Sequence, residues 1–141
     1  MKKKVLLVDS SEDFLDALEY FLNQDPLVET VTRALPGDDA IAAIKRDRPD
    51  VVMVDFVLPS EVGMKLIQDI KATCIPLKVI VLTLNDYDQY RDLAFYSGAD
   101  EFVSKNKIGN VIFPAPCDMF LMKEEKKVLQ GAWVEQNLQS A

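Results

Sequence analysis

Short runs of apolar residues alternate along the chain with stretches whose apolar residues recur every three or four positions. The short runs predict buried strands, and the three-to-four spacing predicts amphipathic helices. The predicted strands cover residues 4–8, 28–35, 51–54, 77–82 and 101–104, and the helices cover 14–22, a segment opening at 36–38, 64–72 and 87–96. Such alternation predicts an α/β fold: a doubly wound, five-stranded parallel sheet with right-handed crossovers. We expect the strand order 2-1-3-4-5, which is the common one for such a sheet.

The predicted helices have recognisable boundaries. Ser10 or Ser11 is a candidate N-cap for the first helix, and Gly98 is placed to end the fourth. A further helix is predicted at about 118–137, where Trp133 either packs internally or anchors an intermolecular contact. We therefore expect one domain over residues 1–141 with its core at 3–106, since no linker or internal repeat interrupts the pattern.

Charge and composition exclude several classes of protein. The 141 residues carry a net charge of −7, which disfavours direct binding to nucleic acid, and no apolar stretch approaches the roughly 18 residues that span a bilayer. The apolar run after the N-terminal lysines is too short for a signal peptide, so a cytoplasmic location is expected. The chain has no histidine and two isolated cysteines, which excludes the usual zinc sites and the Ser–His and Cys–His nucleophile pairs.

Polar residues stand where the predicted strands end. Asp9 and Asp55 end the first and third strands, Thr83 ends the fourth, and Lys105 follows the fifth. In an open parallel sheet these ends share one edge, which is where ligands bind. Two adjacent carboxylates repel each other unless a cation lies between them; Lys105 and a hard ion such as Mg²⁺ would supply that charge. Such a site suits phosphoryl transfer to a carboxylate.

Five segments in order resemble the receiver domain of two-component response regulators, which has a flavodoxin-like fold. They are VLLVD (5–9), VVMVDFVLPSEVG (51–63), VIVLT (79–83), SGADEFV (97–103) and Lys105. Each segment alone is a weak signal, because an aspartate at a strand end is common. Their order and spacing together make the resemblance specific, and it covers residues 3–106.

The resemblance implies a role for the acidic residues. Asp55 would accept a phosphoryl group from a histidine kinase or phosphotransfer protein, without the chain being an enzyme in any wider sense. Asp9, Asp55 and the backbone carbonyl of Val57 would hold Mg²⁺. Pro59 and Gly63 would shape the loop that follows the phosphorylated strand.

The resemblance also implies a switch. Thr83 would hydrogen-bond the phosphoryl group, Lys105 would pair with it, and Phe102 would turn inward when Thr83 moves. Taken singly, these three residues are more often a structural hydroxyl, a surface lysine and a core aromatic residue. The output would be a protein contact, or a homodimer, at the face formed by the fourth helix, the fifth strand and the last helix.

The chain departs from the family pattern in places that affect the site. Ser10 stands where the family usually has a second metal-binding acid, so Mg²⁺ would bind more weakly unless Ser10, Glu12 or Asp13 contributes through a water. Leu84 replaces the small residue that usually follows the threonine and would crowd the phosphoryl pocket. Asn106 replaces a frequent proline, which is a milder change.

These departures leave an alternative: a pseudo-receiver that keeps the fold as an interaction module with little or no phosphorylation. Enzymes on similar sheets fit the residues less well. A haloacid-dehalogenase-like phosphatase would require an aspartate where Val57 stands, and a flavodoxin-like flavin binder would require a phosphate loop where residues 10–13 are acidic.

Overall fold

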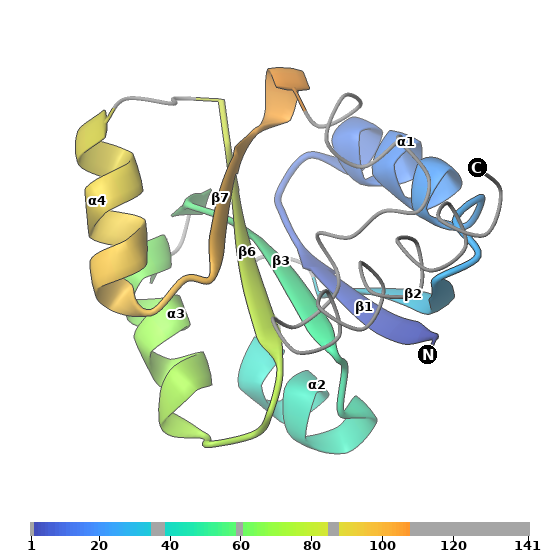
Figure 1. The fold of residues 1–141 in the computed structure, drawn as a ribbon, viewed down its shortest axis with the longest axis horizontal. Coiled ribbons are helices and arrows are strands. Elements are labelled where there is room, and N and C mark those ends of the chain that lie inside the picture. The colour runs from blue at the N-terminus through green and yellow to red at the C-terminus, as the bar shows by residue number, and fades with distance from the viewer. Residues whose placement is uncertain (1, 35–38, 59–60, 85–87, 108–141) are drawn as a thin grey trace, which may run out of the picture.

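A five-stranded parallel sheet forms the centre of the computed structural model, which describes residues 2–34, 39–58, 61–84 and 88–107. The order β2-β1-β3-β6-β7 confirms the predicted 2-1-3-4-5 arrangement (Figure 1). The strands are β1 (Lys3–Val8), β2 (Val28–Ala34), β3 (Val51–Asp55), β6 (Lys78–Thr83) and β7 (Glu101–Ser104). All four neighbouring pairs are parallel, and the exposed pattern of β2 agrees with its place at the edge.

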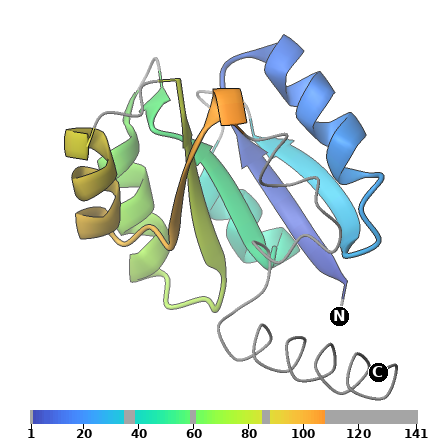
Figure 2. The ribbon, with the colours of Figure 1, turned by 45° about the horizontal axis from the view of Figure 1, so that its top comes forward.

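Helices cover both faces of the sheet (Figure 2). They are α1 (Glu12–Leu22), α2 (Ala40–Asp47), α3 (Gly63–Ala72) and α4 (Asp88–Ser97), and a short 3₁₀ helix, η1 (Lys105–Lys107), follows β7. Buried residues of α1 pack on one face, whereas α2, α3 and α4 pack on the other.

Alternate residues of each strand enter two separate cores, because successive side chains of a strand point to opposite faces. The core on the α1 side contains strand residues Val5, Leu7, Val51, Met53, Ile80, Leu82 and Val103. The opposite core contains Leu6, Val8, Val52, Val54, Val79, Val81 and Phe102. The central strands β1, β3 and β6 are therefore apolar along most of their length, as expected for a sheet that is buried on both faces, whereas the edge strand β2 is mostly polar.

The structure chooses between the two candidate caps of α1. Ser11 is the N-cap: its backbone is extended and its Oγ accepts the Phe14 N–H at 3.2 Å. The helix therefore begins at Glu12, two residues before the apolar spacing that predicts it. Asp39 caps α2 in the same way and accepts the Ala42 N–H at 3.0 Å.

The segment after β3, which the resemblance predicts to be a loop, contains a small hairpin. Strands β4 (Val57–Leu58) and β5 (Glu61–Val62) pair antiparallel immediately before α3. Two-residue strands are too short to produce a recognisable alternation, so the apolar pattern did not reveal them.

Several predicted features fall outside the described residues. These are the helix opening at 36–38, position 87 at the start of the fourth helix, Pro59, the helix at 118–137 and Trp133. Among the residues that are described, no helix has the length and apolar content to cross a membrane.

Candidate functional site

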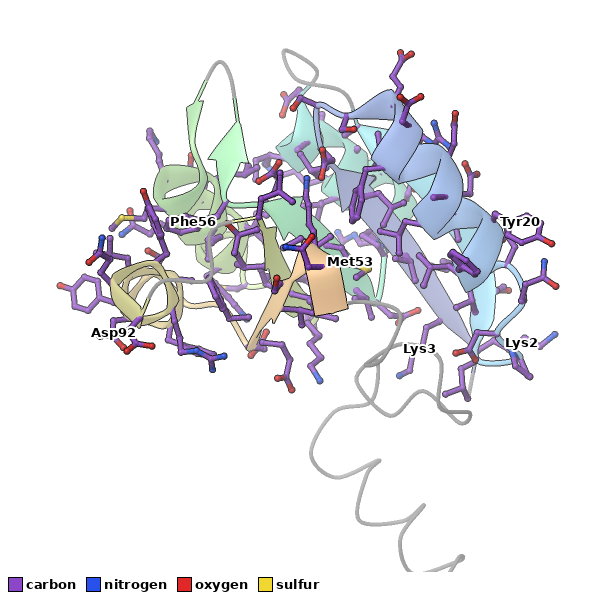
Figure 3. All side chains as sticks on the ribbon, turned by 90° about the horizontal axis from the view of Figure 1, so that it is seen from above. Lys2, Lys3, Tyr20, Met53, Phe56 and Asp92 are labelled. Carbon is purple, nitrogen blue, oxygen red and sulfur yellow. The ribbon has the colours of Figure 1, made fainter. Side chains whose placement is uncertain are left out.

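The register of the sheet brings the predicted site residues to one rim. Val8 pairs with Val54, so Asp9 and Asp55 follow at adjacent positions of β1 and β3. Successive side chains of a strand point to opposite faces of the sheet. By this alternation Asp9, Asp55 and Lys105 lie on the same face as the strand residues that pack against α1. Thr83 continues the opposite alternation and pairs with Ser104 at the end of β7. Figure 3 looks down on this rim.

The Lys105 ammonium bridges the two carboxylates. Its Nζ lies 2.7 Å from Asp9 Oδ2 and 3.0 Å from Asp55 Oδ2. The side chains are 7% exposed for Lys105, 2% for Asp9 and 12% for Asp55, so the three charges are largely removed from water. Two carboxylates and one ammonium leave one net negative charge at the rim, which favours the entry of a further cation.

Asp9 has two differently satisfied oxygens. Its Oδ1 accepts the Ser11 N–H at 2.8 Å, which ties the end of β1 to the start of α1. Its Oδ2 is buried and accepts no hydrogen bond from the described residues, although it forms the ion pair with Lys105. A buried carboxylate oxygen with unfilled lone pairs is a suitable ligand for a hard divalent ion.

The position of Asp55 is fixed by the residue that follows it. The Phe56 N–H donates to the Leu82 carbonyl at 2.9 Å, and the Phe56 ring packs edge-on against Tyr90 with centroids 5.8 Å apart. Figure 3 shows Phe56 on the α3 and α4 side, so β3 sends successive side chains to opposite faces. Asp55 is thereby left on the α1 side beside Asp9.

Gly63 meets the same backbone. Its N–H donates to the Phe56 carbonyl at 3.1 Å, and a Cβ on Gly63 would lie 2.3 Å from that carbonyl oxygen. Any side chain at this position would push α3 away from the end of β3. The glycine in the sequence segment 51–63 is therefore required by close packing beside Asp55.

The predicted switch residues are both buried. Thr83, 2% exposed, ends β6 one residue beyond Leu82, the register partner of Asp55. Phe102, 7% exposed, lies in the core on the α3 and α4 side, with the Arg91 guanidinium 5.3 Å from its ring centroid. The aromatic ring thus lies inward in this structure, under a cation supplied by α4.

The further candidates for the metal site, one serine and two acids, are exposed to solvent. Ser10 is exposed, as are Glu12 and Asp13 in the first turn of α1. Within residues 2–34, 39–58, 61–84 and 88–107, no three acidic, histidine or cysteine side chains form a metal-binding group. Val57 is the first residue of β4, directly after Phe56, and Leu84 is 65% exposed.

The sequence did not indicate two residues that contact the predicted site and switch residues. The Phe14 ring lies 4.4 Å from Lys105 Nζ, and the Arg91 guanidinium covers Phe102. Phe14 begins the apolar spacing that predicts the helix at 14–22, and it packs partly against the core on the α1 side. Its helical spacing does not indicate a nearby ammonium, since Lys105 lies far from Phe14 in the sequence.

Comparison with known proteins gives a family match and similar solved structures. The model of the response regulator receiver domain family matches residues 5–112. The BeF3-activated receiver domain of DrrB, a Thermotoga maritima protein, has 28% identity and a TM-score of 0.68, with 86% of this chain and 98% of that chain covered.

Two further solved structures share the fold at lower identity. The receiver domain of NarL from Mycobacterium tuberculosis has a TM-score of 0.75 at 24% identity, covering 84% of this chain and 96% of that one. The BeF3-activated receiver domain of Klebsiella pneumoniae RstA has a TM-score of 0.71 at 23% identity, covering 84% and 99%. With the family match spanning most of its length, the chain belongs to the response regulator receiver domain family.

Proposed function

We propose that Asp55 accepts a phosphoryl group from a histidine kinase or phosphotransfer protein, and that the phosphorylated chain signals through a protein contact. The observation that carries this is the rim itself: Asp55 Oδ2 is held 3.0 Å from Lys105 Nζ, beside a second carboxylate, in a receiver-family chain. The Asp55 side chain keeps 12% of its surface exposed, so a donor can approach it from the rim.

The transfer requires little covalent machinery. A carboxylate oxygen of Asp55 attacks the phosphorus, the bond to the donor nitrogen breaks, and the electron pair leaves with the donor. The product is an acyl phosphate on Asp55. Lys105 neutralises the incoming oxygens because its ammonium is already at the carboxylate, and Thr83 would donate its hydroxyl to the phosphoryl group. The chain is the acceptor in this reaction, and the Asp55 carboxylate is freed when water or another acceptor takes the phosphoryl group.

Mg²⁺ would be held by Asp9, Asp55 and the carbonyl of Val57. The buried Asp9 Oδ2, which accepts no hydrogen bond from the described residues, supports this donor set. The ion would supply charge neutralisation between the carboxylates and the phosphoryl oxygens. Since Ser10 offers only a neutral hydroxyl and is exposed, we expect weaker Mg²⁺ binding than two adjacent acids would give.

The output surface is proposed to include α4 and β7. Large apolar side chains are exposed along α4 and just before it: Leu84, Leu93, Phe95 and Tyr96, with Tyr96 84% exposed. Exposed apolar residues gathered on one helix are typical of a protein contact. A homodimer through this face is one form of that contact. Direct binding to nucleic acid is disfavoured by the net charge of −7. We propose a cytoplasmic location.

The test is labelling by acetyl phosphate in the presence of Mg²⁺, followed by intact mass. Wild type should gain one phosphoryl group and Asp55→Ala none. Asp69→Ala, an exposed acid on α3, is the matched control and should label like wild type. Equal labelling of Asp55→Ala and wild type would overturn the proposal. Beryllofluoride with Mg²⁺ should also shift the amide signals of Thr83 and Phe102.

A pseudo-receiver is the second candidate, and the isolated pair of carboxylates at the rim favours it. Asp9 and Asp55 lack a third acidic partner among the described residues. A Mg²⁺ titration separates the two functions: no binding at millimolar metal, with no labelling, supports the pseudo-receiver. In that case Ser10→Asp should restore both, because it adds a carboxylate next to Asp9.

A further inference from the structure

An aromatic ring lies over the lysine that bridges the two aspartates. Lys105 Nζ is 4.4 Å from the centroid of the Phe14 ring, within the range in which an ammonium is attracted to the negative face of the ring. The Lys105 side chain is only 7% exposed, so competition from water is weak. The ammonium therefore has three partners: Asp9, Asp55 and Phe14.

Together with two hydrogen bonds at the start of α1, these contacts form a closed ring of interactions that begins and ends at Asp9. Asp9 Oδ1 accepts the Ser11 N–H, and Ser11 Oγ accepts the Phe14 N–H as the cap of α1. The Phe14 ring then contacts Lys105, whose ammonium returns to Asp9 Oδ2 at 2.7 Å. The cap fixes the backbone of Phe14 relative to Asp9, so the ring is held on the Asp9 side of the site.

We propose that Phe14 is a positioning residue that holds the Lys105 ammonium against Asp9 and thereby opposes the entry of a divalent cation. An ion at about 2.1 Å from Asp9 Oδ2 would lie no more than about 5 Å from Nζ where the ammonium now stands. Two cations so close in a buried site repel each other, and they need the same oxygen. Metal binding therefore requires Lys105 to leave Asp9, and Phe14 resists that movement.

This proposal rests on the proposed function, because the position of Lys105 affects signalling only if its ammonium has to reach a phosphoryl group on Asp55. The placement of the ammonium, however, can be measured without any phosphorylation. The side-chain Hε protons of Lys105 should be shifted upfield by the ring current of Phe14 in the metal-free protein. Phe14→Leu should remove that shift, whereas Phe14→Tyr should keep it, because tyrosine retains the ring face.

Mg²⁺ affinity is the second measurement, followed through the amide signals of Asp9 and Ser10. Phe14→Leu should bind Mg²⁺ about two- to thirtyfold more tightly than wild type, which spans the usual strength of a cation–π contact from exposed to desolvated sites. Phe14→Tyr should remain near wild type. Phe21→Leu is the matched control, since it makes the same change at an exposed position of the same helix.

A double-mutant cycle separates positioning from packing. In a Lys105→Met background, Phe14→Leu should leave Mg²⁺ affinity unchanged, because no ammonium remains to be held. An unchanged Lys105 shift in Phe14→Leu, or equal Mg²⁺ affinity of wild type and Phe14→Leu, overturns the proposal; so does an equal effect of Phe14→Leu in both backgrounds. If wild type is not labelled by acetyl phosphate while the ring-current shift and the double-mutant cycle are as expected, the proposed function is refuted and the role of Phe14 is not.

Discussion

Replacing Lys105 by methionine should strongly destabilise the fold. The substitution keeps the length of the side chain and removes its charge, which leaves the carboxylates of Asp9 and Asp55 facing each other. Their side chains are 2% and 12% exposed, and Asp9 Oδ2 accepts no hydrogen bond from the described residues. Removing one member of a buried ion pair costs about 3–5 kcal/mol, because the remaining charge is uncompensated.

Urea unfolding without metal measures this loss. With a slope of about 2 kcal/mol per molar urea, a loss of about 4 kcal/mol lowers the midpoint by ~2 M. Lys65→Met is the matched control: its ammonium pairs with Asp69 at 3.0 Å, but the side chains are 75% and 48% exposed. Exposed pairs of this kind contribute about 0.3–0.5 kcal/mol.

Two further measurements identify the cause of the instability. Asp9→Asn in the Lys105→Met background should recover part of the lost stability, because only one buried carboxylate then remains. Mg²⁺ should stabilise Lys105→Met more than wild type, since the ion replaces the missing positive charge. A Lys105→Met protein within about 1 kcal/mol of wild type, and no more sensitive than Lys65→Met, would refute this account of the site.

Three other substitutions test the surroundings of the site. Gly63→Ala should lower stability by about 1–3 kcal/mol, because its Cβ would lie 2.3 Å from the Phe56 carbonyl oxygen; an unchanged melting temperature would contradict the close approach. Ser11→Ala should cost ~1 kcal/mol in urea unfolding through loss of the α1 cap, whereas Ser10→Ala should cost nothing measurable; equal effects would show that the cap is misassigned. Arg91→Ala should cost about 0.5–1 kcal/mol, because its guanidinium covers two aromatic rings, and calorimetry showing no loss would argue against those contacts.

The apolar pattern predicted the five strands of the sheet and their parallel direction, and the common order for such a sheet is the one observed. Strands that are apolar at every position must be buried on both faces, and strands that alternate with helices must run parallel. The same pattern predicted that Asp9 and Asp55 meet at one rim, because the carboxyl ends of parallel strands share an edge. The register between Val8 and Val54 agrees with that prediction.

Boundaries and short elements were less predictable. Ser11, and not Ser10, caps α1 because the backbone brings the Ser11 hydroxyl to the Phe14 N–H. The hairpin of β4 and β5 has two residues in each strand, too few to show a period. Local preference alone does not decide either feature, because several conformations of such short segments have similar free energies.

The sequence predicted that Lys105 joins the two aspartates at the rim, but only the tertiary structure decided which oxygens the ammonium reaches and which aromatic ring covers it. Lys105 and Asp55 are 50 residues apart in sequence, and Phe14 belongs to a helix whose spacing indicated nothing but packing. Sequence pattern reports the face on which a side chain lies, since that follows from the local period of the backbone. Which oxygens the ammonium reaches, and which ring covers it, depends on sheet register, twist and helix placement together. These are properties of the assembled fold, because each contact joins segments that only the sheet brings together.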